Sequence, residues 1–196
     1  MNIIRIKYGN TNTYFVNGLL IDTDMAGAGA IAGLRRELKK QGIPQDSVRF
    51  IFATHYHPDH MGLIGELMRD GAALLLPEWQ KEYVHSSDCI FARDKRSGFV
   101  PIDESGAVII SAEESRTFLA GLGISGEIVP TKSHSPDGAA LILDDGNAFV
   151  GDLEPREFIG GYENNAALCE DWNIVLRLGA NVIHYGHAND QTVKTN

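Results

Sequence analysis

The sequence predicts a protein of mixed α and β structure, either α/β or α+β. Short β-rich runs alternate with segments whose apolar residues recur at helical spacing, and no internal repeat breaks this order. The chain has 196 residues and is 43% hydrophobic, which is enough for a substantial core in one domain spanning residues 1–196. Two sheets packed between helical layers would bury the apolar faces of both kinds of element.

The first part of the chain predicts a helix enclosed between strands. Asn17-Gly18 is a hairpin signal between two extended runs. Ile31, Leu34 and Leu38 recur at helical spacing, and Gly42 ends that pattern. We therefore expect strands over 2–8, 12–16, 19–22 and 48–53, and a helix over 27–41.

The remainder repeats this alternation. Pro77 suits the first position of a helix, and Asp144-Asp145-Gly146-Asn147 is a turn between two apolar runs. We expect helices over 60–70, 78–84, 112–121 and 171–178, and strands over 73–76, 126–130, 139–143, 147–151 and 181–184. Residues 86–105 have no clear period, and their interpretation as an excursion or a substrate lid stays open.

A dense group of metal-compatible side chains follows directly after the strand expected over 48–53. His55, His57, Asp59 and His60 lie within six residues. Imidazole nitrogens and carboxylate oxygens are ligands that zinc and related divalent ions prefer. His55 and His57 point the same way on an extended segment, whereas Asp59 and His60 follow a turn at Pro58 and can face a second point. This spacing predicts that one segment serves two adjacent metals.

Three more ligand-type residues come just past the ends of expected strands. They are His134, Asp152 and His187, and glycine precedes the last two. A single histidine in such a place is more often a packed or surface residue than a ligand. The repeated position at strand ends, where α/β proteins tend to place their chemistry, favours a shared site for all three.

These residues in this order resemble the metallo-β-lactamase-fold hydrolase superfamily, and the resemblance runs over nearly the whole chain. It includes Leu20-Ile21-Asp22-Thr23, Gly151-Asp152 and Gly186-His187. It implies an α+β fold, a four-layer αβ/βα sandwich in which two mixed sheets pack face to face with helices outside. It also implies a two-metal site at one edge of the sheets.

The resemblance also assigns roles to residues. It implies that His55, His57 and His134 bind one metal, that Asp59, His60 and His187 bind the second, and that Asp152 bridges them. Zinc is the expected metal, with iron and manganese as alternatives. A hydroxide between the two ions would attack the substrate, and Asp59 would orient it and move a proton. Asp22 would support a metal-bound histidine, with capping of a turn as the competing role.

Several departures narrow the expected activity. Asp152 stands where the commonest true β-lactamases of this fold carry cysteine, which argues against antibiotic hydrolysis. His57 stands where the di-iron oxygen reductases of the family carry glutamate, which argues against an oxygen reductase. Nine residues follow His187, so we do not expect the helical substrate-binding segment of glyoxalase II relatives.

Other signals are weaker. Gly27-Ala28-Gly29-Ala30-Ile31-Ala32 matches a dinucleotide-binding pattern, but the following strand ends in Thr54-His55 rather than in an acid, so we interpret it as a flexible connection. Lys132 could meet an anionic substrate, but a solvated loop lysine explains it better. A basic group of Arg93, Lys95 and Arg96 between Phe91 and Phe99 could form a lid over such a substrate, although a solvated loop explains it at least as well. His184 is expected in the core or supporting the site, His85 has no partner in sequence, and Cys89 and Cys169 are interpreted as structural.

Composition limits the partners. The formal charge is −9, which disfavours a nucleic-acid role, and no apolar run reaches membrane-spanning length. The two cysteines form neither a CxxC pair nor a disulfide framework, which favours the cytoplasm.

The expected function is metal-dependent hydrolysis of a small ester-like, thioester or phosphoester substrate. Two alternatives stay open within the same fold. One is a mononuclear iron dioxygenase that acts on a thiol or persulfide, and the other is a non-catalytic metal- or ligand-binding sensor.

Overall fold

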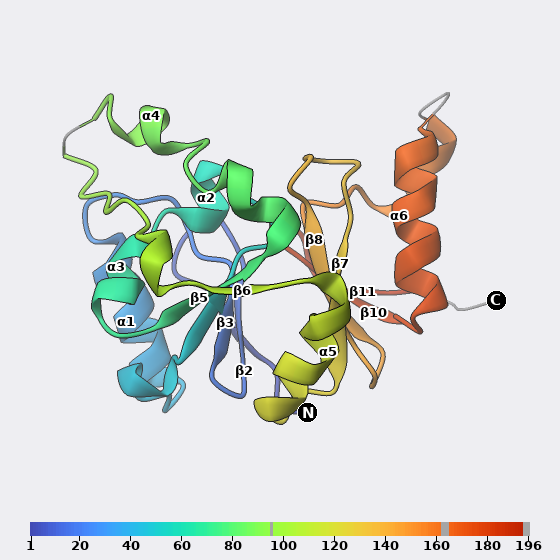
Figure 1. Ribbon diagram of the computed structural model, residues 1–196, viewed down its shortest axis with the longest axis horizontal. Coiled ribbons are helices and arrows are strands. Elements are labelled where there is room, and N and C mark those ends of the chain that lie inside the picture. The colour runs from blue at the N-terminus through green and yellow to red at the C-terminus, as the bar shows by residue number, and fades with distance from the viewer. Residues whose placement is uncertain (95, 162–164, 194–196) are drawn as a thin grey trace.

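Two β-sheets lie face to face at the centre of the molecule, with helices against their outer faces (Figure 1). The computed structural model describes residues 1–94, 96–161 and 165–193. The first sheet has the strand order β1-β2-β3-β4-β5-β6 and the second the order β11-β10-β9-β8-β7. This is the α+β sandwich that the sequence predicted.

The first sheet takes its strands mainly from the N-terminal half of the chain. It contains β1 (Ile4–Ile6), β2 (Thr13–Val16), β3 (Leu19–Ile21), β4 (Phe50–Phe52), β5 (Ala73–Pro77) and β6 (Val108–Ile110). The first three strands are antiparallel neighbours, and β3 to β6 run parallel. The carboxyl ends of β3 and β4 therefore meet at the same edge.

The second sheet comes from the C-terminal part of the chain. It contains β7 (Gly126–Pro130), β8 (Ala139–Leu143), β9 (Asn147–Gly151), β10 (Val182–Tyr185) and β11 (Gln191–Thr192). Antiparallel pairing of β7, β8 and β9 makes β7 and β9 run the same way, and β10 is parallel to β9. The carboxyl ends of β7, β9 and β10 therefore share one edge.

Helices cover both outer faces (Figure 1). The α-helices are α1 (Ala30–Lys40), α2 (Pro58–Met61), α3 (Ile64–Arg69), α4 (Asp88–Phe91), α5 (Ala112–Gly121) and α6 (Ala166–Arg177). Short 3-10 helices are η1 (Gln45–Ser47), η2 (Glu78–Tyr83), η3 (Glu104–Gly106) and η4 (Arg156–Gly161). None of the helices in the described ranges has both the length and the apolar character needed to cross a bilayer.

The core divides into three layers because side chains alternate along each strand. In β3, Leu19 and Ile21 pack between the sheets, whereas Leu20 packs toward α1 and α3. In β9, Phe149 packs between the sheets, whereas Ala148 and Val150 pack toward α6. Both faces of each sheet are thus buried, and the near-continuous apolar strands follow from this arrangement.

Several elements differ from the sequence prediction. The helix expected over 60–70 is two short helices, α2 and α3. Between them the Leu63 N–H donates to the Thr23 hydroxyl at 3.2 Å instead of to a helix carbonyl. The helix expected over 78–84 is the 3-10 helix η2. The last helix begins at Ala166 instead of 171, since Asn165 caps it by accepting a hydrogen bond from the Leu168 N–H.

Two strands escaped prediction. Both β6 and β11 lie at sheet edges and have three and two residues, too few for an alternation pattern to be seen.

Candidate metal centre

The chemistry-bearing residues converge at the edge where strands of both sheets end. Thr54 and His55 follow β4, and one turn of helix, α2, carries Asp59 and His60. His57 precedes that turn in an extended conformation, and Pro58 starts it. From the second sheet, His134 follows β7, Asp152 follows β9 and His187 follows β10.

The sheets are tied together at this edge by backbone hydrogen bonds. The Ala139 N–H, at the start of β8, donates to the Thr54 carbonyl at 2.8 Å. The Asn12 N–H, just before β2, donates to the Gly186 carbonyl at 2.7 Å. These bonds fix the second-sheet residues in register with the motif on the first sheet.

Three imidazoles form the first group of potential ligands. The Nε2 atom of His55 lies 2.9 Å from Nδ1 of His57, and that Nδ1 lies 3.2 Å from Nε2 of His134. All three donor atoms lie within 4.8 Å of one another. His55 is buried, whereas His57 and His134 are exposed, so this group opens to solvent on one side.

The second group contains Asp59, His60 and His187. The two imidazole Nε2 atoms lie 3.3 Å apart, and Nε2 of His187 lies 3.1 Å from Oδ2 of Asp59. These donor atoms also lie within 4.8 Å of one another. His60 is completely buried, and Asp59 is about one-third exposed.

Asp152 lies between the two groups. Its Oδ1 is 3.3 Å from Nε2 of His60, and its Oδ2 is 3.5 Å from Nε2 of His187. The same Oδ2 lies 3.9 Å from His55 and 3.8 Å from His134. One carboxylate therefore faces donor atoms of both groups. The structure brings together all seven residues that the sequence singled out.

The orientation of two imidazoles is fixed by neighbours outside the cluster. Asp22 Oδ2 lies 3.0 Å from Nδ1 of His60, which leaves Nε2 to face the cluster. The Thr54 hydroxyl donates to Asp22, so its oxygen can accept the Nδ1 proton of His55 at 3.2 Å. Asp22 also accepts a hydrogen bond from the Thr54 N–H at 2.7 Å. Such partners select which ring nitrogen is free to bind a metal.

Burial and charge shift the titration of the cluster. Burial, reinforced by the charge of His60, lowers the pKa of His55 to about 2. Burial opposes protonation of His60, but the carboxylates of Asp22 and Asp152 outweigh it and raise the pKa of His60 to about 10. Burial lowers the pKa of His134. Burial alone would raise the pKa of Asp152, but the hydrogen bond and charge of His60 outweigh it and hold the pKa of that carboxyl below its usual range.

Two aspartates that the sequence analysis missed hold the loop that carries His134. Asp137 accepts a hydrogen bond from the Tyr56 N–H at 2.6 Å, between His55 and His57, and another from the Ser135 hydroxyl. Asp171 of α6 accepts one from the Ser133 N–H at 2.7 Å. Asp137 follows a Ser-Pro turn, which was a local signal; Asp171 gave none, because its partner lies far away in sequence.

Other residues considered from the sequence lie away from the cluster. The ring of His184 is buried and stacks on Phe149 with centroids 4.7 Å apart, in agreement with a core role. His85 is exposed and lies 2.9 Å from Asp88. Cys89 and Cys169 are free thiols, and the exposure of Cys89 contradicts a structural role for it.

The segment 86–105 is attached to the metal motif at one end. The Ser87 hydroxyl donates to the Tyr56 carbonyl at 2.6 Å. Phe91 and Phe99 stack on each other with centroids 4.0 Å apart. Arg93 and Arg96 are exposed, and Lys95 lies outside the described residues. Lys132 is also exposed.

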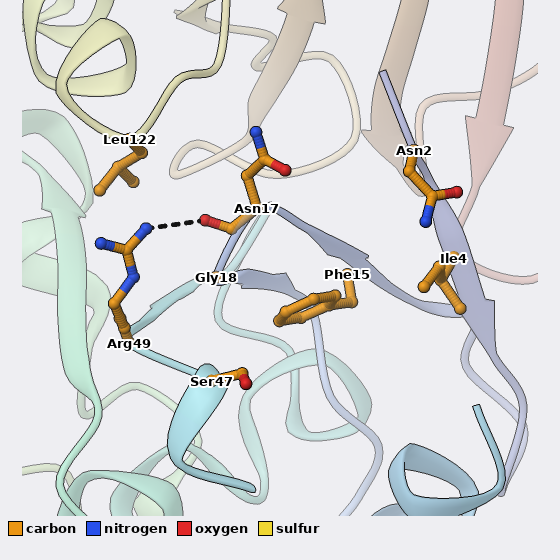
Figure 2. Close-up of a pocket in the computed structure, with 8 residues that line it drawn as sticks. All are labelled: Asn2, Ile4, Phe15, Asn17, Gly18, Ser47, Arg49 and Leu122. Atoms are coloured by element: carbon orange, nitrogen blue, oxygen red, sulfur yellow. Dashed lines mark hydrogen bonds between the residues drawn. The ribbon is translucent and has the colours of Figure 1, made fainter. Parts of the chain in front are cut away.

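Two pockets differ in the residues that line them. One of about 240 Å³ lies beside the cluster and is lined by His134, Asp152 and His187 together with neighbouring residues. A larger one, about 480 Å³, lies at the opposite edge, where Gly18 and Arg49 precede β3 and β4 (Figure 2). There Arg49 donates to the Asn17 carbonyl at 3.0 Å, and no metal-compatible cluster lines it. Donor chemistry, not size, identifies the functional edge.

Comparison with known proteins agrees with this arrangement. A model of the metallo-beta-lactamase superfamily matches residues 6–188. No curated protein matches this chain.

Solved structures share the fold at low sequence identity. A metallo-beta-lactamase family protein from Thermus thermophilus has a TM-score of 0.69 and 21% identity, over 97% of this chain and 74% of that protein. TTHA1623, solved in a di-iron-bound form, has a TM-score of 0.66 and 22% identity, over 98% and 94%. The metallo-beta-lactamase MIM-1 from Novosphingobium pentaromativorans has a TM-score of 0.62 and 20% identity, over 93% and 76%.

Proposed function

Because this chain belongs to the metallo-beta-lactamase superfamily, we propose that it is a binuclear metal-dependent hydrolase of a small ester-like, thioester or phosphoester substrate. The observation that carries the proposal is the convergence of two three-residue donor groups around the carboxylate of Asp152.

The donor geometry supports the choice of zinc. Zinc–nitrogen bonds of about 2.0–2.1 Å in tetrahedral geometry separate ligand nitrogens by about 3.3 Å. The nitrogen–nitrogen distances of 2.9 and 3.2 Å in the first group and 3.3 Å in the second are close to that value. Iron or manganese would accept the same nitrogen and oxygen donors.

The residues divide into two sets of ligands in this proposal. One ion would be held by His55, His57 and His134, the other by Asp59, His60 and His187, and Asp152 would contribute to both. Two divalent ions bound in this way supply Lewis-acid activation of water and of the acceptor oxygen of the substrate.

The protein's own groups orient the reaction. Asp22 holds Nδ1 of His60, and Thr54 holds Nδ1 of His55, so that the Nε2 atoms of both rings face the reacting centre. Asp59 is about one-third exposed and lies at the solvent side of the cluster, where its carboxylate can orient water and accept a proton. No serine or cysteine nucleophile is required.

The proposal is tested by metal quantification and turnover in one preparation. We expect two metal ions per chain and hydrolysis of one class in a panel of phosphodiester, thioester, lactone and sulfate-ester substrates. A chelator should abolish the activity. His134→Ala should lose both metal and activity, while the control His85→Ala, outside the cluster, should keep both.

Other results would support the alternatives. One iron per chain with oxygen consumption on a thiol or persulfide would identify a dioxygenase. Metal binding without turnover of any substrate would indicate a sensor.

A further inference from the structure

The pocket beside the candidate metal centre has walls that could select a substrate. Beyond the three cluster residues, it is lined by Gly151, Leu153, Glu154, Pro155, Tyr185 and Ala188. Its volume is about 240 Å³, half that of the pocket at the opposite edge. We expect it to receive one substituent of a substrate rather than the whole molecule.

Glu154 is the charged residue in this pocket that the metal cluster does not use. Asp152 faces the donor atoms of the cluster, whereas no hydrogen bond or ion pair joins the Glu154 side chain to another residue in the described ranges. No lysine or arginine lines the pocket. Lys132, Arg93 and Arg96, which the sequence offered as contacts for an anion, are not among its lining residues.

Tyr185 is the aromatic residue in the lining. Its hydroxyl donates to Gln191 at 2.8 Å, so the polar end of the side chain is already occupied and the residue is almost fully buried. The rest of the wall is apolar through Leu153, Pro155 and Ala188. Glu154 is exposed, and a carboxylate beside apolar residues attracts a positive charge and contacts the carbon atoms attached to it.

Building on the proposed hydrolysis, we propose that this pocket selects substrates carrying a quaternary or primary ammonium group, with Glu154 as the residue that sets this specificity. The ammonium group lies away from the bond that is cleaved, because the bound metals repel positive charge at the reacting centre. Glu154 attracts it without a hydrogen bond or ion pair to the cluster, and the apolar wall of Leu153, Pro155 and Ala188 receives its carbon substituents.

The first test compares two substrates of equal shape and different charge. Esters or thioesters of choline and of 3,3-dimethylbutanol differ in a trimethylammonium against a tert-butyl group. For the metal-loaded protein, kcat/KM should be at least roughly fivefold higher for the choline compound, as expected for one partly exposed ion pair. The preference should shrink as salt is added. Equal values, or a preference for an anionic analogue, would overturn the proposal.

The second test removes the charge from the pocket. Glu154→Gln should reduce kcat/KM for the choline compound roughly fivefold and leave the neutral compound unchanged. Glu170→Gln is the matched control, since Glu170 is exposed on α6 and does not line the pocket. If both variants behave alike, Glu154 does not set specificity.

A binding measurement separates this inference from the proposed hydrolysis. Choline and 3,3-dimethylbutanol are titrated into the metal-loaded protein, and chemical-shift changes are followed by NMR. If the protein hydrolyses nothing but binds choline in preference to the alcohol, and loses that preference in Glu154→Gln, the proposed hydrolysis fails and the ammonium pocket stands. Absence of any preference in both hydrolysis and binding overturns the pocket.

Discussion

At the scale of single residues, the proposed function depends on a few side chains that control imidazole orientation. Asp22 is the clearest case, because it contacts both the motif strand and His60 while its backbone has a φ of 57°. Aspartate tolerates this left-handed conformation better than most residues, but it still carries a cost. The contacts of the Asp22 carboxylate with Thr54 and His60 offset the cost of this backbone conformation.

We expect Asp22→Asn to weaken metal binding about 10- to 100-fold, because the charge that holds Nδ1 of His60 is lost. Affinity is measured by competition with a chromogenic chelator. Asp46→Asn, an exposed position in η1, serves as the control. Unchanged affinity in Asp22→Asn would show that Asp22 only caps the turn.

We expect Gly186→Ala to disrupt the cluster. A Cβ atom there would lie 2.6 Å from Cε1 of His60 and 2.7 Å from Oδ1 of Asp152, closer than real contacts allow. Metal content, measured by mass spectrometry, should fall while Gly27→Ala, which meets nothing within 4 Å, keeps the wild-type value. Full metal occupancy in Gly186→Ala would contradict this geometry.

We expect metal binding to release a proton from His60. With its pKa raised to about 10, His60 is protonated near neutral pH in the metal-free protein, and it must become neutral to bind a metal. Affinity should therefore increase as pH rises toward 10. His55, with its pKa lowered to about 2, is already neutral and releases none. Calorimetry in buffers of different ionisation enthalpy measures the release, and an enthalpy independent of the buffer would contradict it.

At the scale of elements, strand ends and one loop determine how the site is assembled. The sequence placed the strands around the metal motif well, since buried β-rich runs ending at His55, Asp152 and His187 have a local pattern. It could not show how the loop between β7 and β8 is held. That loop depends on Asp137 and Asp171, whose partners are distant in sequence.

We expect Asp171→Ala to destabilise the loop that carries His134. The partly buried Ser133 N–H loses its charged acceptor, which costs about 1–3 kcal/mol of unfolding free energy. Chemical denaturation measures this loss, and metal content should fall in parallel. The adjacent exposed residue provides the control Glu170→Gln, which should leave both unchanged. Normal metal binding in Asp171→Ala would mean that the loop is held by other contacts.

At the scale of the whole molecule, the candidate metal centre joins the two sheets. Its candidate donors come from the segment after β4 on one side and from the ends of β7, β9 and β10 on the other. A ligand that binds only the folded protein stabilises it in proportion to the logarithm of its concentration. Metal should therefore stabilise the contact between the sheets as well as supply chemistry.

We expect saturating metal to raise the melting temperature. At about 100 times the dissociation constant, the gain of about 2.7 kcal/mol corresponds to roughly 5–10 °C for a protein of this size. Thermal melts with and without chelator measure it. His55→Ala should show a much smaller shift, and an identical shift in that variant would place the stabilising metal elsewhere.

The sequence by itself determined the candidate donor residues, the family resemblance and the alternation of strands and helices. These are local properties. Ligand chemistry belongs to single side chains, and a strand that is buried on both faces is recognised by its run of consecutive apolar residues. The α+β sandwich followed from the resemblance and is confirmed.

Only the tertiary structure decided which atoms face one another. It set Nε2 of His60 toward His187 through Asp22, anchored the His134 loop to α6, and gathered Glu154 and Tyr185 into one pocket. These relations depend on the register of two sheets and on contacts between residues far apart in the chain. No local pattern encodes them, because they arise only when the sheets pack.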